Sequence, residues 1–309
     1  MRDILNDVMM ETVKHIIRKH FGDCAFEVGK PMNITNNHVY PFMAAGDRYF
    51  LKLYRNKDWP EEGKIPFVYR RLSDRNIPHA GLVAYSRDDE IYPNGYLIER
   101  EVRGTAADKM RLDREQEVRL YAKLAEFMSM VHDIHIENYG YIGNGTACYN
   151  SMIDFLEDEF DGLGSRLKDI IQEKRLNTLK EKVIETMSDF GDLPSVLSHG
   201  DLSKKNIILR DDGEITLIDW DDAMSLCCMA DVSRLTLWMK QNCNGQDYTL
   251  FRNVFLEHYR TTYRKAEFDV FESAYHIYLA LDSLLFYSRV GDRVMENRLK
   301  RYLNDVEIT

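Results

Sequence analysis

The segment from residue 196 to residue 222, VLSHGDLSKKNIILRDDGEITLIDWDD, constrains the fold of this 309-residue chain more than any other. A polar loop in it is followed by two short apolar runs, 207–209 and 215–218, with Asp-Asp-Gly between them. Apolar runs of strand length around a glycine turn predict a β-hairpin. The hairpin would bring Asp219, thirteen residues after Asn206, back beside the loop.

Three side chains at the ends of this hairpin suit phosphoryl transfer. Asp201 is a carboxylate that can accept a hydroxyl proton, whereas Asn206 and Asp219 offer the amide and carboxylate oxygens that Mg²⁺ prefers. An Asp and an Asn five residues apart also occur in loops where each bonds its own backbone. The third acid, at the end of an apolar strand, favours the catalytic interpretation.

The spacing resembles a known catalytic pattern. His199-Gly200-Asp201, Asn206 and Asp219-Trp220-Asp221 match in spacing the catalytic loop and metal-binding Asp of protein kinases. In this chain, however, the residues HGD and IDWD resemble those of the aminoglycoside phosphotransferase and choline kinase family, and not those of the protein kinases. The resemblance implies an α+β, bilobal protein-kinase-like fold, with a five-stranded antiparallel sheet in the N-terminal lobe and a mainly helical C-terminal lobe.

The resemblance extends over essentially the whole chain and implies its division. We expect an N-terminal nucleotide-binding lobe over residues 1–98, a hinge connector over 99–104, and a helical lobe with the catalytic loop and acceptor site over 105–309. A helix over 113–132 would end at His132, a histidine bonded beneath the catalytic loop, and Asp231 would tether that loop through backbone N–H groups.

Lys52 lies on an alternating strand, residues 47–54. A lysine on a sheet is more often a solvated residue, but the resemblance places Lys52 where an ammonium pairs with the α and β phosphates. The resemblance implies an acid partner on the next helix, expected to begin at residues 59–62. Glu62 is our choice, although the family spacing points a few residues later, where Lys64 and Ile65 cannot serve. The alternative is that Glu61 and Glu62 only complement the helix dipole.

The remaining nucleotide contacts are implied by the resemblance alone. The glycine-rich flap of protein kinases is missing, and a loop with Asn36 and Asn37 would cover the phosphates instead. Ile98 would face the adenine ring. Glu99 and Glu101 would offer it a backbone carbonyl and an amide.

The acceptor is the least constrained part of the prediction. With 41 Lys and Arg against 51 Asp and Glu, the net charge is −10, which suits a cationic acceptor and argues against nucleic-acid binding. Acids of the second lobe bind substrate amino groups in the aminoglycoside kinases, and here five acids fall within eight positions: Asp154, Glu157, Asp158, Glu159 and Asp161. Such a run is usually a solvated face, so the four chosen as acceptor-binding candidates, Asp154, Glu157, Asp158 and Asp161, compete with that alternative.

The sequence therefore predicts a kinase that transfers the γ-phosphoryl group of ATP or GTP, with Mg²⁺, to a hydroxyl of a small amino-bearing, aminoglycoside-like molecule. Choline, ethanolamine, homoserine and other metabolites remain alternative acceptors, because the aromatic residues of the last helices would suit a quaternary ammonium. A non-catalytic nucleotide-binding member of the fold is a further alternative. Five cysteines without C-x-x-C spacing and the lack of a long apolar run predict a cytoplasmic protein that binds no membrane. We expect it to be a monomer or dimer.

Overall fold

The computed structural model describes residues 2–33, 37–87, 89–260 and 263–307. The chain forms two compact units, each assembled from separate stretches. The first unit contains Met1–Met110, Gly143–Gly145 and Lys204–Asp222, and the second contains Arg111–Ile142, Thr146–Ser203 and Ala223–Thr309. The expected lobe boundaries at 98 and 104 remain a prediction.

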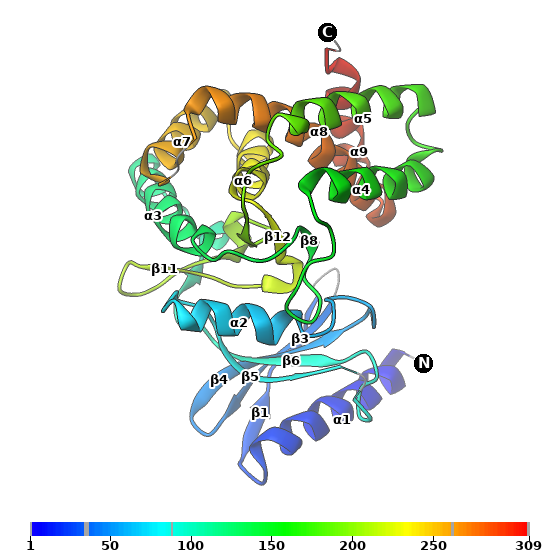
Figure 1. The fold of residues 1–309 in the computed structure, drawn as a ribbon. Helices are drawn as coiled ribbons and strands as arrows, with labels where there is room; N and C mark the ends of the chain where they lie inside the picture. Colours follow the sequence, from blue (N-terminus) through cyan, green and yellow to red (C-terminus); the bar gives the residue numbers. More distant parts are fainter. Residues whose placement is uncertain (1, 34–36, 88, 261–262, 308–309) are drawn as a thin grey trace. The chain divides into compact units, whose positions relative to one another are not determined.

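An antiparallel sheet is the centre of the first unit (Figure 1). Five of its strands run in the order β1-β3-β4-β6-β5, and the short β2 pairs with β3. Their bounds are β1 (Phe26–Val28), β2 (Met32–Asn33), β3 (Asn37–Ala44), β4 (Asp47–Tyr54), β5 (Gly81–Ser86) and β6 (Tyr96–Arg100). A two-residue turn joins β3 to β4 as a hairpin, whereas β4 pairs with β6 only after the chain has passed through α2 and β5.

Two helices cover the two faces of this sheet, α1 (Arg2–Phe21) and α2 (Lys64–Asp74) (Figure 1). The α1 face is apolar, and Ile16 and Ile17 pack there with Leu51 and Ile98 in one buried cluster. Side chains alternate along a strand, so Lys52 lies on the opposite face. Its direct partner across the β4–β6 ladder is Leu97.

Helix α2 begins later than the sequence indicated. Gly63 precedes it with a left-handed φ of 73°, and Lys64 is its first residue. Pro66 then falls in the first turn, where a missing backbone N–H costs no helical hydrogen bond. The expected start at residues 59–62 is therefore wrong, and the acids Glu61 and Glu62 precede the helix.

The predicted hairpin is confirmed, with β10 (Ile207–Leu209) paired to β11 (Ile215–Leu217). It belongs to the first unit, where β7 (Thr105–Ala106) joins β10 as the third strand. Three single-turn 3₁₀ helices complete this region: η1 (Ala107–Lys109), η2 (Lys204–Asn206) and η3 (Trp220–Asp222). Two of them, η2 and η3, directly flank the hairpin.

The second unit is mainly helical. Its helices are α3 (Arg114–His132), α4 (Met152–Leu167), α5 (Glu173–Ser188), α6 (Cys228–Asn242), α7 (Gly245–His258), α8 (Lys265–Val290) and α9 (Arg293–Asp305). A small sheet joins them, with order β8 (Gly140–Tyr141), β12 (Met224–Cys227), β9 (Ser195–Ser198). Helix α8 is the buried axis, since it packs against α4, α5, α6 and α9.

Helix α3 ends where the sequence predicted. Asp113 caps its first turn by accepting a hydrogen bond from the Gln116 backbone N–H at 2.8 Å, and the Asp113 N–H donates to the Gln116 side-chain oxygen at 2.9 Å. The helix ends at His132, and Ile134 then accepts from the Leu197 N–H of β9 at 2.8 Å. This bond fixes the strand that leads into the HGD loop. In the described part of the chain, no helix has the length and apolar character needed to cross a membrane.

Candidate active site

Lys52, in the first unit, forms ion pairs with two aspartates. Its Nζ lies 2.6 Å from Asp219 Oδ1 and 2.8 Å from Asp221 Oδ2. Burial opposes its charge, but the carboxylates of Asp219, Asp221 and Glu99 outweigh burial and raise the pKa of Lys52. The ammonium is therefore kept charged inside the protein, as a phosphate ligand must be.

Glu99 is the third acid near Lys52. It leaves β6 on the α2 face and accepts a hydrogen bond from the Tyr69 hydroxyl of α2. Burial raises the pKa of Glu99 to about 7; Lys52 opposes this shift, and the carboxylates of Asp221 and Asp219 add to it. The site therefore holds a carboxyl group that titrates near neutral pH.

The expected partner of Lys52 on helix α2 is wrong. Glu62 is exposed, and within the described residues the ion pairs of Lys52 run to Asp219 and Asp221. The α2 residue that reaches this region is Lys64, which is fully buried, pairs with Glu61 and donates to the Asp221 carbonyl at 3.2 Å. The late helix start is the reason, because it places a lysine where an acid was expected.

The other predicted nucleotide residues have mixed outcomes. Asn37 opens β3, is buried and has its Nδ2 3.5 Å from Asp221 Oδ2, while Asn36 lies outside the described residues. Ile98 packs on the α1 face, so the residue on the Lys52 face is Leu97, one position earlier. The Glu101 N–H donates to the Arg48 carbonyl at 2.9 Å, so the amide expected to bind adenine is engaged in the sheet.

The two predicted metal ligands lie at one end of the β10–β11 hairpin. The Ile218 N–H donates to the Asn206 carbonyl at 3.0 Å, which aligns Asn206 with the residue preceding Asp219. Asp219 has a φ of 65°, a left-handed conformation that non-glycine residues rarely adopt and that is often found at functional sites. The Asn206 amide and the Asp219 carboxylate fit Mg²⁺. The Asp219 side chain is 42% exposed, which suits an ion that keeps several bound waters.

In the second unit, Asp231 holds the backbone of the HGD loop. Its Oδ2 accepts from the His199 N–H at 2.7 Å, and its Oδ1 accepts from the Gly200 N–H at 3.1 Å. Burial opposes its charge, but the bonds from His132 and the His199 backbone keep the pKa of Asp231 below its usual value. The predicted tether is confirmed, and it fixes the backbone directly before Asp201.

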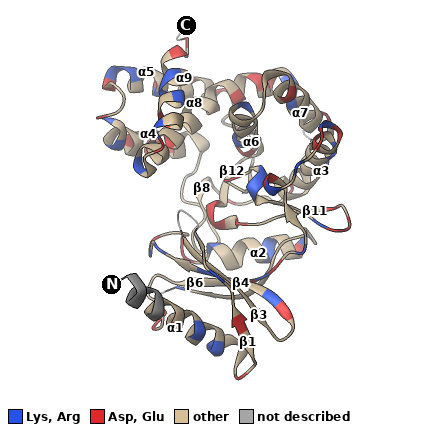
Figure 2. Cartoon of the chain, turned by 180° about the vertical axis from the view of Figure 1, so that it is seen from behind, with Lys and Arg blue, Asp and Glu red and all other residues tan. Residues whose placement is uncertain are grey.

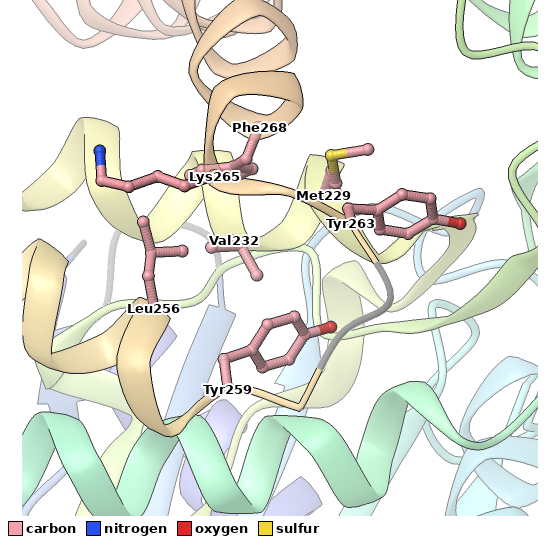
Figure 3. A pocket seen from close by; sticks show the side chains of 7 residues that line it. All are labelled: Met229, Val232, Leu256, Tyr259, Tyr263, Lys265 and Phe268. Atoms are coloured by element: carbon pink, nitrogen blue, oxygen red, sulfur yellow. The ribbon is translucent and has the colours of Figure 1, made fainter.

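His132 has the predicted position behind the loop. One ring nitrogen lies 3.3 Å from Asp231 Oδ2, and the other lies 2.5 Å from the Tyr259 hydroxyl. Tyr259 also borders a cavity of about 70 Å³, shown in Figure 3 with apolar neighbours such as Val232 and Leu256. Ligand pockets usually measure about 300–1,000 Å³, so this cavity is too small for a kinase acceptor.

The four acids predicted to bind the acceptor lie on the exposed surface of α4. The Asp154 N–H is capped by Ser151, Asp158 accepts from the Tyr149 hydroxyl at 2.6 Å, and Glu157 is exposed. Helix α5 packs against α4 and carries basic residues, coloured blue in Figure 2. One of them, Lys180, pairs with Asp161 at 2.5 Å.

The fifth acid of that run, Glu159, has a different environment. It is half-buried, and its two oxygens accept from the hydroxyls of Tyr141 at 2.9 Å and Tyr278 at 3.0 Å. Burial raises the pKa of Glu159; these two hydrogen bonds oppose the shift, and Asp282 adds to it. Glu159 is therefore the acid of the run that points into the protein.

Asp282 lies near both Glu159 and Arg234, since its charge adds to the raised pKa of Glu159 and it forms an ion pair with Arg234. Arg234 lies 3.9 Å from Asp282. Burial opposes its charge, but the charges of Asp282 and Asp201, with nearby tyrosines, raise the pKa of Arg234. Sequence reasoning missed Asp282, Arg234, Lys64 and Asp221. Only Asp221 had a signal in the sequence, because it is a second acid two residues after Asp219 in the IDWD motif.

Comparison with known proteins gives the class and then the family. Residues 34–268 match the family model described as the phosphotransferase enzyme family, APH. The match spans most of the chain, so the protein is a phosphotransferase and belongs to this family. No curated protein matches the sequence.

Solved structures share the fold at low sequence identity. A thermostable mutant of the aminoglycoside phosphotransferase APH(4)-Ia has a TM-score of 0.74 at 18% identity, covering 94% of this chain and 96% of that chain. A mutant of the same enzyme in ternary complex with AMP-PNP and hygromycin B gives 0.74 at 17%, covering 95% and 97%. The choline kinase LicA from Streptococcus pneumoniae gives 0.66 at 15%, covering 96% and 99%. The predicted α+β, kinase-like fold is confirmed.

Proposed function

We propose that this phosphotransferase is a small-molecule kinase that transfers the γ-phosphoryl group of ATP or GTP to a hydroxyl of an amino-bearing acceptor. The observation that carries the proposal is the buried Lys52 ammonium, held between Asp219 and Asp221 at 2.6 and 2.8 Å. A charged lysine beside an acid in a strained backbone conformation suits a metal-nucleotide. The structural neighbour crystallised with AMP-PNP supports a nucleotide donor.

The proposed roles follow from the chemistry of each residue. Asn206 and Asp219 hold Mg²⁺, which when bound neutralises phosphate charge. Lys52 orients the phosphates, and Asp201 accepts or orients the proton of the acceptor hydroxyl. The Asp231 hydrogen bonds to the loop backbone limit the movement of Asp201, so its position is largely set before the acceptor binds.

We assign the acceptor's amino group to Glu159 and Asp282, and not to the four exposed acids chosen from the sequence. Both lie in the second unit with Asp201, and after burial the charges of both acids raise the pKa of the Tyr278 hydroxyl. Glu159 has lost part of its hydration shell, so a cation beside it is screened less than one at an exposed acid. Burial raises the pKa of Glu159, and an ammonium beside this carboxyl group would favour its ionised form.

A choline-type acceptor is the second candidate, favoured by the tyrosines beside Glu159. Tyr141 and Tyr278 both donate to this carboxylate, so aromatic rings and a negative charge occur together. Such a combination binds a single quaternary ammonium. A polyamine acceptor would instead gain from several acids.

A nucleotide-consumption screen tests the function. The protein with Mg²⁺ and ATP or GTP is assayed against an aminoglycoside panel, choline, ethanolamine, homoserine and methylthioribose, with product confirmed by mass spectrometry. We expect acceptor-dependent nucleotide consumption with at least one amino-bearing compound. Tight Mg-nucleotide binding without turnover on any acceptor would favour the non-catalytic alternative.

Paired variants then test the acceptor assignment. Glu159→Gln and Asp282→Asn should raise the acceptor KM while leaving the nucleotide KM unchanged, and the wild-type acceptor KM should rise with ionic strength. Asp154→Asn, Glu157→Gln, Asp158→Asn and Asp161→Asn are the matched set of exposed acids. An effect confined to this second set would restore the assignment made from the sequence.

We further propose a cytoplasmic protein that acts as a monomer or dimer and binds neither nucleic acid nor membrane. Its net charge of −10 supports the proposal that it binds no nucleic acid. Light scattering of the purified protein distinguishes the two oligomeric states, and cell fractionation tests the location.

A further inference from the structure

We infer that Asp221 is the residue that positions Lys52 for the nucleotide phosphates, a role that no acid of helix α2 supplies. The inference rests on the proposed kinase function. The Lys52 Nζ lies 2.8 Å from Asp221 Oδ2, and the two side chains are 10% and 2% exposed. A contact this short and this buried fixes the lysine's end more firmly than a solvated pair.

Asp219 cannot take over this role when the nucleotide is bound. It also contacts Lys52, at 2.6 Å, but its side chain is 42% exposed and it is the proposed Mg²⁺ ligand. A carboxylate that coordinates a metal has less charge to share with an ammonium. We therefore expect Asp221 to stay beside Lys52 when Asp219 binds the metal.

Asp221 is itself held from three elements of the first unit. The Tyr54 hydroxyl of β4 donates to its Oδ1 at 3.3 Å, and Asn37 of β3 places Nδ2 3.5 Å from its Oδ2. Lys64 of α2 donates to its backbone carbonyl at 3.2 Å. Both carboxylate oxygens face protein donors and the residue is 1% exposed, so its surroundings suit an ammonium partner better than a hydrated metal.

Helix α2 contributes a lysine, and not an acid, beside Asp221. Lys64 is fully buried and pairs with Glu61, and Glu62 is exposed. The acid that holds Lys52 therefore comes from the Asp219–Asp222 segment, and the helix contributes a lysine that holds the acid's backbone.

Kinetics of Asp221→Asn test the inference, because asparagine keeps the shape and removes the charge. We expect the KM for the nucleotide to rise at least ~10-fold and kcat to fall at least ~10-fold, with the acceptor KM unchanged. Asp221→Glu should recover part of the loss. Asp212→Asn, in the exposed turn of the same β10–β11 hairpin, is the matched control and should leave all three constants unchanged.

A second-site variant makes the test specific. Adding Lys64→Glu to Asp221→Asn places an acid on α2 at the position that reaches Asp221, and should restore nucleotide affinity at least ~3-fold relative to Asp221→Asn alone. A residue with a merely structural role would lower the melting temperature of Asp221→Asn and leave the constants of the folded enzyme unchanged. That result would overturn the inference.

Two other results would also overturn it. If Glu62→Gln, and not Asp221→Asn, raises the nucleotide KM, the acid preceding α2 positions Lys52. If Asp221→Asn raises the Mg²⁺ concentration needed for half-maximal activity ~10-fold while nucleotide affinity at saturating Mg²⁺ is unchanged, Asp221 is a metal ligand. A wild-type protein that binds no nucleotide by calorimetry would instead refute the proposed function itself, and the inference with it.

Discussion

Asp221 and Asp231 are both buried aspartates, yet their environments differ in kind. Asp221 faces the side-chain ammonium of Lys52, whereas Asp231 faces the backbone N–H groups of His199 and Gly200. Burial raises the pKa of Asp221 despite Lys52, with the Asp219 carboxylate adding to the rise. The donors around Asp231 overcome burial and lower its pKa.

This difference separates two ways of using a buried charge. Backbone N–H groups cannot leave, so Asp231 is permanently satisfied and stabilises the loop before Asp201. Lys52 is shared between two acids in the protein and is expected to be shared with phosphates during the reaction. We therefore expect changes in the first unit's cluster to alter nucleotide binding, and changes in the HGD loop to alter turnover or stability.

The largest expected effect is on metal-dependent binding. Asp219→Ala removes the exposed carboxylate of the first unit's cluster, and a bound Mg²⁺ is the largest local charge in such a site. We expect Mg-ATP affinity, measured by calorimetry, to fall by at least ~10²-fold, to the level of metal-free ATP. Affinity within a few-fold of wild type would show that Asp219 is not a metal ligand.

The next effect belongs to the loop and should appear in turnover alone. Asp201→Asn keeps the size of the side chain and removes the proton acceptor, so kcat should fall at least ~10²-fold while Mg-nucleotide affinity stays nearly unchanged. Steady-state kinetics and calorimetry on the same preparation measure both. Unchanged turnover would remove Asp201 from the mechanism and break the comparison.

A smaller effect compares the two buried aspartates directly. Asp231→Asn replaces one of two accepting oxygens with an NH₂ group that faces an N–H donor, and we expect the free energy of unfolding to fall by about 1–3 kcal/mol. Asp221→Asn should cost less at neutral pH, because folding already disfavours the ionised form of this carboxyl. Chemical denaturation of both variants measures the difference.

The pH dependence gives this pair a second readout. The lowered pKa of Asp231 means that its contribution is present above the ordinary aspartate pKa of 3.8 and is lost as the pH falls below it. The deficit of Asp231→Asn relative to wild type should therefore shrink on acidification. A larger cost for Asp221→Asn at every pH would reverse our view of which aspartate stabilises the fold.

Local patterns in the sequence were enough to predict the hairpin, the end of α3 and the Asp231 tether. Each depends on neighbouring residues or on a spacing that the backbone transmits directly. The partner of Lys52 was not predictable in this way, because Asp221 is 169 residues away and a glycine and a proline delay the start of α2. Ile98 was assigned to the wrong face because a shift of one residue reverses a strand's side chains.

The smallest expected effect concerns Glu99, the acid of the first cluster that titrates near neutrality. Its pKa of about 7 lies above the ordinary 4.5, so the folded protein favours the protonated form. The resulting stabilisation is complete below pH 4.5 and is lost as the pH rises to about 7. Glu99→Gln keeps an acceptor for the Tyr69 hydroxyl and removes the titration, so its melting temperature should vary less than that of wild type across this range.

The difference in melting temperature between Glu99→Gln and wild type is therefore expected to move in favour of the variant between pH 5 and 8. A protein of this size gains roughly 2–4 °C per kcal/mol, so a change of several degrees is measurable. Glu101→Gln, two residues further along, is the control, since its carboxylate pairs with Arg48 at 3.4 Å. Parallel pH curves for Glu99→Gln and wild type would mean that Glu99 is ionised throughout, and that the carboxylates around Lys52 are better compensated than their burial indicates.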